Sequence, residues 1–299
     1  MTDLRAAVDS YLALRRGLGF ALEDHGRVLP DFVDYLRRND ASHVSTELAL
    51  AWATGPDNVS PVWWRQRLSM VRGFAEYLRT IDPATEVPPR DLLPARQQRV
   101  APYLYSDADI AALMAAARSL TPPPRAATYE TIIGLLLVTG LRLGECLALN
   151  RADLDRNRHQ LRVPRAKRGG RVVPLHDTTI GKLDDYIEYV DRHFPSPASP
   201  ALFVSIRGTR MNRDSMHATF PVLIDRAGLT GRGQRVRPRI HDLRHSFAVR
   251  QLLDWHRQHA DIDARIPLLS TVLGHSDPVS TYWYYSDSRV IPIPGLLAA

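Results

Sequence analysis

A cluster of cationic and imidazole side chains lies in the segment HDLRHSFAVRQLL at residues 241–253. His241, Arg244 and His245 are spaced at i, i+3 and i+4, which places them on one face of a helix. A guanidinium and imidazoles on one face can bind a phosphate. The same spacing also fits a solvated basic helix face. It fits a zinc site less well, because the glutamate of the usual zinc helix is missing and no third ligand stands out.

A second candidate phosphate ligand is Arg142, in the segment TGLRLGECLAL at residues 139–149. Gly140 interrupts an apolar helical run, Arg142 follows at once, and Glu145 lies three positions later. An arginine directly after a buried run is held on a rigid frame, as a phosphate-binding arginine must be. The alternative interpretation is an Arg142–Glu145 pair on a helix surface.

Lys167 is a candidate general acid. It lies in a basic Gly-Gly turn between two predicted strands, near 159–164 and 170–174. The chain contains 37 arginines but only two lysines, Lys167 and Lys182. A lysine can lose its proton near a site, whereas a guanidinium effectively cannot. Lysine therefore suits a group that protonates a departing oxygen, although a lysine in a turn can also simply be solvated.

Several tyrosines near the C-terminus supply a candidate nucleophile, in the segment LLSTVLGHSDPVSTYWYYSDS at residues 268–288. Gly274-His275 is predicted to end one helix, and Asp277-Pro278 to begin another that carries Tyr282, Trp283, Tyr284 and Tyr285. A tyrosine can attack phosphorus if its proton is removed and the phosphate is neutralised. The alternative is an aromatic helix packed on the core.

The elements that must position these residues divide the chain into two predicted domains. Apolar periodicity predicts a bundle of about four helices over residues 1–81, with Ser60-Pro61 beginning one of them. Residues 82–102 are rich in proline and read as a linker. In residues 103–299, Ser106 is predicted to cap the first helix. The remaining predicted helices are 126–139, 178–191, 213–227, 241–257, 265–273 and 278–285. The predicted fold class is mainly α, with one small β-hairpin.

Composition and charge indicate which class of partner the protein binds. The net charge is +7, and residues 1–100 carry 13 basic and 13 acidic side chains, so residues 101–299 hold the excess. A basic C-terminal part favours a polyanion, with nucleic acid first. The single cysteine, Cys146, excludes an intrachain disulfide and suits a reducing cytoplasm. No signal peptide or membrane-spanning run of about 18 apolar residues is present in the sequence.

Taken together, these motifs resemble the tyrosine recombinase (phage integrase) family over residues 103–290. The resemblance lies in their order along the chain: Arg…Glu, a hairpin Lys, His-x-x-Arg, Gly-His and Tyr. The resemblance implies that Lys167 is the general acid for the 5′-hydroxyl leaving group. It also implies that Tyr284 forms a 3′-phosphotyrosyl bond and that Glu145 orients the site. Four residues would bind and polarise the scissile phosphate: Arg142, His241, Arg244 and His275.

The resemblance carries further expectations. Residues 1–81 would be a core-binding domain that clamps double-stranded DNA. The enzyme would act as a homo-oligomer, a tetramer on the DNA synapse, with accessory recombination proteins as candidate partners in the bacterial cytoplasm, associated with the nucleoid. Preorganised arginines and histidines can stabilise the negative charge on the phosphate without a metal. The sequence also contains no P-loop. No cofactor is therefore expected. The segment GHSDPVSTYWYYS is similar to integrases of transposons and other mobile elements.

Three alternatives remain open on the sequence. A type IB topoisomerase would share the tyrosine and the basic pocket. A catalytically silent DNA-binding accessory protein would tolerate loss of a catalytic residue, and none is missing. A structural helical protein with a basic surface would form no covalent DNA adduct. The hairpin tip at residues 167–171 is about one residue shorter than the family pattern, which bears on the role of Lys167.

Overall fold

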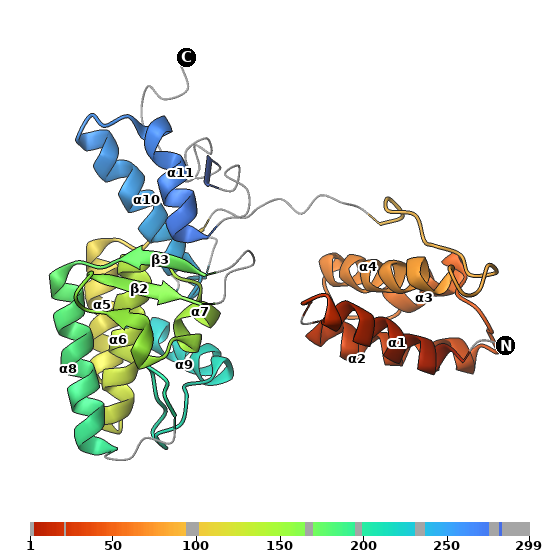
Figure 1. The fold of residues 1–299 in the computed structure, drawn as a ribbon, viewed down its shortest axis with the longest axis horizontal. Coiled ribbons are helices and arrows are strands. Elements are labelled where there is room, and N and C mark those ends of the chain that lie inside the picture. The colour runs from red at the N-terminus through yellow and green to blue at the C-terminus, as the bar shows by residue number, and fades with distance from the viewer. Residues whose placement is uncertain are drawn as a thin grey trace. The chain divides into compact units, whose positions relative to one another are not determined.

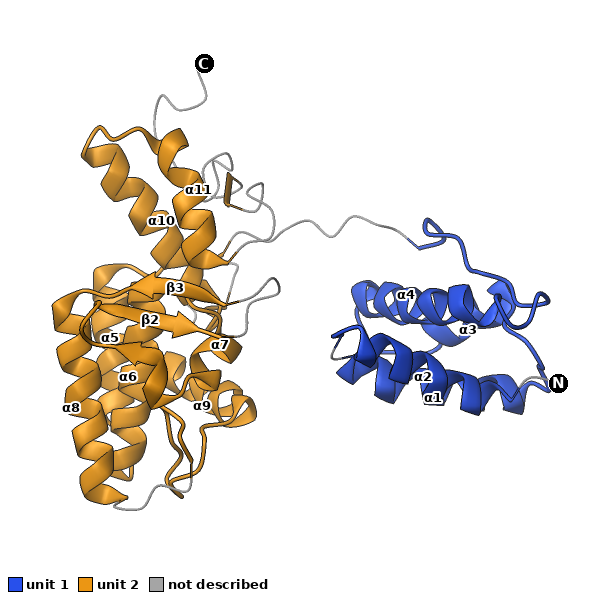
Figure 2. Cartoon of the chain, viewed as in Figure 1, with its two compact units in different colours: residues 1–99 blue, residues 100–299 orange. Residues whose placement is uncertain are grey.

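The computed structural model describes residues 3–20, 22–93, 102–164, 170–194, 199–230, 237–274 and 281–282. The chain divides into two compact units, residues 1–99 and 100–299 (Figure 2). Each unit encloses its own hydrophobic core. The described residues contain eleven α-helices and a three-stranded antiparallel sheet, which confirms the predicted fold class.

The first unit is a bundle of four helices: α1 (Leu4–Gly17), α2 (Glu23–Arg38), α3 (Thr46–Thr54) and α4 (Pro61–Leu78). Their apolar stripes meet in a core where Val8, Phe32 and Phe74 have no exposed surface. Ser60 caps α4 by accepting a hydrogen bond from the Trp63 amide, with Pro61 at the first helical position. That helix start is as predicted.

Residues 82–93 pack against the first unit, although the sequence assigns them to a linker. The Glu86 amide donates to the Val44 carbonyl at 2.8 Å. The Arg72 guanidinium donates to the carbonyls of Pro88 and Pro89 at 2.7 and 2.6 Å. Proline has no amide hydrogen but keeps its carbonyl, so a proline-rich segment without periodicity can still be held by side-chain donors.

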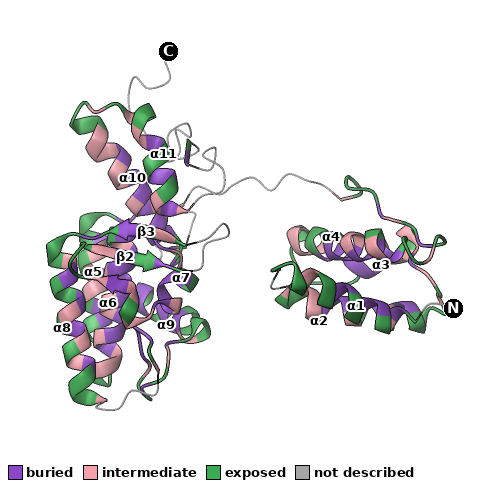
Figure 3. Ribbon diagram, viewed as in Figure 1, coloured by how far each residue is buried: buried purple, intermediate pink, exposed green. Residues whose placement is uncertain are grey.

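The second unit is organised around α6 (Pro123–Thr139), which packs against α5 (Asp107–Arg118), α8 (Asp177–His193) and α10 (Asp242–Arg257) (Figure 1). Buried residues recur along α6 (Figure 3), and two of them, Ile132 and Ile133, have no exposed surface. Ser106 caps α5 as predicted, its hydroxyl accepting from the Asp109 amide at 3.1 Å. The short helix α7 (Leu143–Ala148) follows α6, and α9 (Arg213–Arg226) packs against α5 and α7.

The sheet has the order β1 (Leu154–Asp155), β2 (Gln160–Val163) and β3 (Arg171–Pro174). Strands β2 and β3 form the predicted hairpin, with Leu161 opposite Val173 and Val163 opposite Arg171. The tip at residues 165–169 lies outside the described residues. Strand β1 is too short for its alternation to be recognised in the sequence.

The last described helix, α11 (Ile262–Leu273), packs against α10 and β3. It begins three residues before the predicted start, because Asp261 caps it by accepting from the Ala264 amide. The predicted helix 278–285 lies outside the described residues apart from helical residues 281–282. Among the described residues, no helix is both long and apolar enough to cross a membrane.

Candidate active site

The site is built on a tight turn after α6. Gly140 ends this helix in the left-handed region, with φ of 62°. A Cβ at this position would lie 2.4 Å from Cδ1 of Phe247 in α10 and 2.8 Å from Cδ2 of Leu273 in α11. Only glycine therefore allows α10 and α11 to approach the turn that leads to Arg142.

Gly140→Ala should lower the free energy of unfolding by about 2 to 4 kcal/mol, because it adds left-handed backbone strain to a steric clash. Urea unfolding of the purified chain measures the change. Gly144→Ala is the matched control, since a Cβ there meets nothing within 4 Å. Equal stabilities for the two variants would contradict a steric requirement at Gly140.

Arg142 is oriented by the buried carboxylate of Glu145. The Arg142 amide donates to Oε2 of Glu145 at 2.9 Å, and its Nη1 donates to Oε1 at 2.9 Å. Glu145 is 8% exposed, whereas the Arg142 side chain is 40% exposed. The pair is thus not the helix-surface pair that the sequence left open. One partner is buried and fixes the direction of the other, which remains accessible.

Arg171, at the start of β3, is a site residue that the sequence interpretation missed. Its Nη1 and Nη2 donate to the two oxygens of Glu145 at 2.9 and 2.7 Å, and its Nε donates to the Val272 carbonyl at 2.8 Å. Its side chain is 7% exposed. The available signal was strand alternation, because Arg171 shares a face with Val173, which is buried.

The C-terminus of α11 accepts hydrogen bonds from three arginines. The carbonyls of Val272, Leu273 and Gly274 accept from Arg171 at 2.8 Å, Arg244 at 2.7 Å and Arg142 at 3.1 Å, respectively. The last carbonyls of a helix lack intrahelical partners, and cations there oppose the negative end of the helix dipole. Three separate elements therefore converge on the three residues that precede His275 in the sequence.

Arg244 lies on the first turn of α10 and is 2% exposed. Its Nη1 donates to the Gly140 carbonyl at 2.7 Å, so it joins the turn after α6 to the end of α11. The structure therefore contradicts the solvated basic helix face that the sequence left open. The guanidinium is a buried cation satisfied by hydrogen bonds.

The surroundings lower the pKa of both Glu145 and His241, for different reasons. Burial alone would raise the pKa of Glu145, but hydrogen bonds from Arg171 and Arg142, together with the charge of Arg171, lower it to about 2. Glu145 thus stabilises the fold above its ordinary pKa, and this contribution is lost as the pH falls towards about 2. His241 is exposed, yet partial desolvation and the charges of Arg244 and Arg142 lower its pKa. The shift favours the neutral imidazole.

Four of the seven predicted site residues are described, and the structure brings them together: Arg142, Glu145, His241 and Arg244. The other three, Lys167, His275 and Tyr284, lie outside the described residues. His245 stacks edge-on against His241 with ring centroids 4.8 Å apart. Within the described ranges, no three His, Cys, Asp or Glu side chains are grouped to hold a metal ion.

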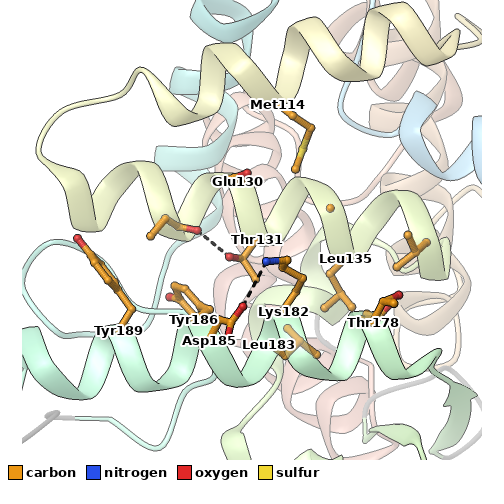
Figure 4. Close-up of a pocket in the computed structure, with 14 residues that line it drawn as sticks. Met114, Glu130, Thr131, Leu135, Thr178, Lys182, Leu183, Asp185, Tyr186 and Tyr189 are labelled. Carbon is orange, nitrogen blue, oxygen red and sulfur yellow. Dashed lines mark hydrogen bonds and ion pairs between the residues drawn. The ribbon is translucent and has the colours of Figure 1, made fainter.

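The second lysine of the chain, Lys182, lies on α8 in the second unit. Lys182 lines a cavity of about 510 Å³ between α5, α6 and α8, where its Nζ is 3.2 Å from Asp185 (Figure 4). Its side chain is 83% exposed. None of the predicted site residues that the structure describes lines this cavity.

Comparison with known proteins identifies the family. Residues 104–289 match the sequence profile of the Phage integrase family. The chain is 42% identical over 295 residues to the putative integrase/recombinase y4rB of Sinorhizobium fredii, covering 96% of this chain and 94% of that protein. It is 26% identical to the tyrosine recombinase XerC of Herpetosiphon aurantiacus, with 94% and 90% covered. The chain therefore belongs to the phage integrase family of tyrosine recombinases.

Solved structures agree with this assignment at the level of the fold. The Tn1549 transposon integrase in complex with circular intermediate DNA superposes with a TM-score of 0.67 at 17% identity, covering 94% of this chain and 95% of that one. A lambda integrase dimer bound to a core site superposes with a TM-score of 0.61 at 19% identity, with 93% and 96% covered.

Proposed function

We propose that this protein is a site-specific DNA recombinase that cleaves and rejoins DNA strands through a 3′-phosphotyrosyl intermediate. The observation that carries the proposal is the convergence of Arg142, Arg171 and Arg244 on the end of α11, next to His275. This arrangement concentrates positive charge around one partly accessible guanidinium. The family membership and the motif order support the same chemistry.

Arg142 is suited to bind the scissile phosphate. A guanidinium has five N–H donors, and its side chain uses one bond to Glu145 and one to the Gly274 carbonyl. The remaining donors and its 40% exposure suit an incoming phosphate oxygen. Because both existing bonds are in place before DNA binds, little reorganisation is needed when charge develops on the non-bridging oxygens.

Arg244 and His241 complete the described part of the proposed phosphate site. Arg244 adds a second positive charge, and at 2% exposure this charge is weakly screened by solvent. A neutral His241 offers one donor and one acceptor. It can hydrogen-bond a phosphate oxygen or accept a proton during the reaction.

Lys167, His275 and Tyr284 complete the proposal from the motif match. Tyr284 attacks phosphorus as its hydroxyl proton passes to a general base, for which His241 is the described candidate. The tyrosine oxygen forms the bond to the 3′-phosphate, and the bond to the 5′-oxygen breaks. Lys167 gives its proton to that departing 5′-oxygen. Attack by a 5′-hydroxyl on the phosphotyrosine then reverses these steps and rejoins the DNA. Each transfer exchanges one phosphoester bond for another, so we expect no metal, ATP or other cofactor.

The proposed partner is double-stranded DNA, held by a homo-oligomer that reaches a tetramer at the synapse, with accessory recombination proteins as further candidates. We also propose that the recombination serves a mobile element. Support comes from the segment GHSDPVSTYWYYS and from the fold shared with the Tn1549 transposon integrase. A cytoplasmic location at the nucleoid follows from such a substrate.

Covalent capture on DNA tests the proposed function. The whole chain is incubated with sheared genomic DNA of the source organism, the mixture is denatured, and DNA that remains attached to protein is sequenced. We expect one recurrent site attached through its 3′ end. Recovery of no attached DNA would overturn the proposal. Strand exchange between two labelled duplexes of the captured site then distinguishes a recombinase from a type IB topoisomerase, which would relax DNA without efficient exchange.

The proposed clamp makes a prediction about salt and about the first unit. Affinity of the whole chain for the captured duplex should fall roughly 10³-fold between about 50 and 200 mM salt, because bound phosphates release counterions. A fragment of residues 103–299, which contains its own core, should bind more weakly and show a shallower salt dependence. Gel-shift titrations measure both. Equal affinity of the folded fragment and the whole chain would refute the clamp.

A further inference from the structure

We propose that Arg171 is a positioning residue for DNA cleavage, acting on Arg142 through the carboxylate of Glu145 and on the end of α11 through the Val272 carbonyl. The inference rests on the proposed function and adds a residue to its machinery. It concerns placement of the phosphate-binding groups, and no contact between Arg171 and DNA is required.

The contacts of Arg171 are directed to the protein. All three guanidinium nitrogens donate, two of them to Glu145 and Nε to Val272. With a side chain 7% exposed, Arg171 is poorly placed to reach a phosphate, whereas Arg142, bonded to the same carboxylate, is 40% exposed. Each oxygen of Glu145 accepts from both arginines. Arg171 therefore fixes the plane of the carboxylate that aligns Arg142.

The geometry explains why this position needs an arginine. The planar fork of a guanidinium can bind both carboxylate oxygens while its Nε donates in a third direction. A lysine at this position would retain the charge but not the three-way connection. Gly274 at the end of α11 leaves room for the guanidinium of Arg171, because a Cβ on Gly274 would lie 2.7 Å from its Nη1.

The position of Arg171 also connects the hairpin to the site. It is the first residue of β3 and follows Lys167 by four positions. Its contacts join β3 to Glu145 in α7 and to the last turn of α11. One side chain thus ties the base of the hairpin to the elements that carry Arg142 and precede His275.

The experiment compares cleavage of two duplexes of the captured site, one with a normal scissile phosphodiester and one with a neutral methylphosphonate there. Arg171→Lys should slow single-turnover cleavage of the phosphodiester about 100-fold, the order of loss that a misplacement of about 1 Å causes. The defect should shrink markedly on the methylphosphonate, because a substrate without a charged non-bridging oxygen depends less on correctly placed arginines. DNA affinity should remain near that of the wild type.

Controls separate this inference from the proposed function and from folding. Arg156→Met removes an exposed arginine that follows β1 and pairs with Asp184. This variant should cleave DNA at the wild-type rate. If wild type and Arg156→Met form no adduct, the proposed function fails. If they form it and Arg171→Lys cleaves normally, or is equally slow on both substrates, the positioning role is overturned. Should Arg171→Lys melt far below wild type, Glu145→Gln is the second variant and must show the same substrate dependence.

Discussion

Tyr284→Phe should bind the captured DNA site with near-normal affinity and form no covalent complex in denaturing gels. Loss of the hydroxyl removes the nucleophile while it leaves the phosphate-binding arginines in place. Gel-shift titration measures the binding, and labelled DNA retained with denatured protein measures the adduct. This is the largest effect that we expect from a single atom, because the intermediate itself cannot form.

The choice of Tyr284 over its neighbours rests on two arguments. In the family that the motifs resemble, the tyrosine follows the Gly-His histidine by nine residues, and Tyr284 is nine residues after His275. In the predicted helix 278–285, successive residues would point about 100° apart, so only one of Tyr284 and Tyr285 can face the phosphate-binding arginines. Tyr282 would lie about 200° from Tyr284 and face elsewhere.

The neighbouring tyrosines provide matched controls. Tyr282→Phe and Tyr285→Phe remove the same atom from the same segment and should still form the adduct. If Tyr284→Phe retains the adduct and Tyr285→Phe abolishes it, the register is wrong by one residue. If all three variants retain it, the nucleophile lies elsewhere in the chain.

Local elements could be predicted because their signals are local. The caps at Ser60 and Ser106 and the β2–β3 hairpin are determined by residues within a few positions of one another. The same holds for the left-handed turn at Gly140, where an apolar run ends. Arg142 and Glu145 could be paired from their spacing, and the structure adds that the carboxylate is buried.

The arrangement around the end of α11 could not be predicted from local pattern. Arg171 is separated from Glu145 by 26 residues and from Val272 by 101, so only the tertiary fold brings them together. Helix-terminal carbonyls carry no sequence signature of their own, because every residue has one. For the same reason, the packing of residues 82–93 through proline carbonyls was not anticipated.

The roles proposed for the predicted site residues rest on different kinds of evidence. For Arg142, Glu145 and Arg244, the proposal rests on the motif match and on hydrogen bonds that hold each group in place. For His241 it rests on the motif match and on the surrounding charges. For Lys167, His275 and Tyr284 it rests on the motif match alone, since they lie outside the described residues. Experiments on the last group are therefore the most informative.

Lys167→Ala should slow cleavage of the normal phosphodiester by about 10² to 10⁴-fold, the usual contribution of a general acid. The variant should recover most of the wild-type rate on a duplex with sulfur at the 5′-bridging position. A thiolate leaves without being protonated, so the acid becomes dispensable on that substrate. Lys167→Arg should also be slow on the normal substrate, because a guanidinium keeps its proton.

Lys182→Ala is the matched control, because Lys182 is the other lysine of the chain. It lies on α8 beside Asp185, on a cavity that none of the described site residues lines (Figure 4). It should cleave both substrates at the wild-type rate. Single-turnover rates on the two duplexes give the result directly. A Lys167→Ala chain that is equally slow on both substrates would show that this lysine only binds DNA. The proton for the 5′-oxygen must then come from another group. His241, whose lowered pKa favours the neutral imidazole, would have to gain a proton before it could supply one.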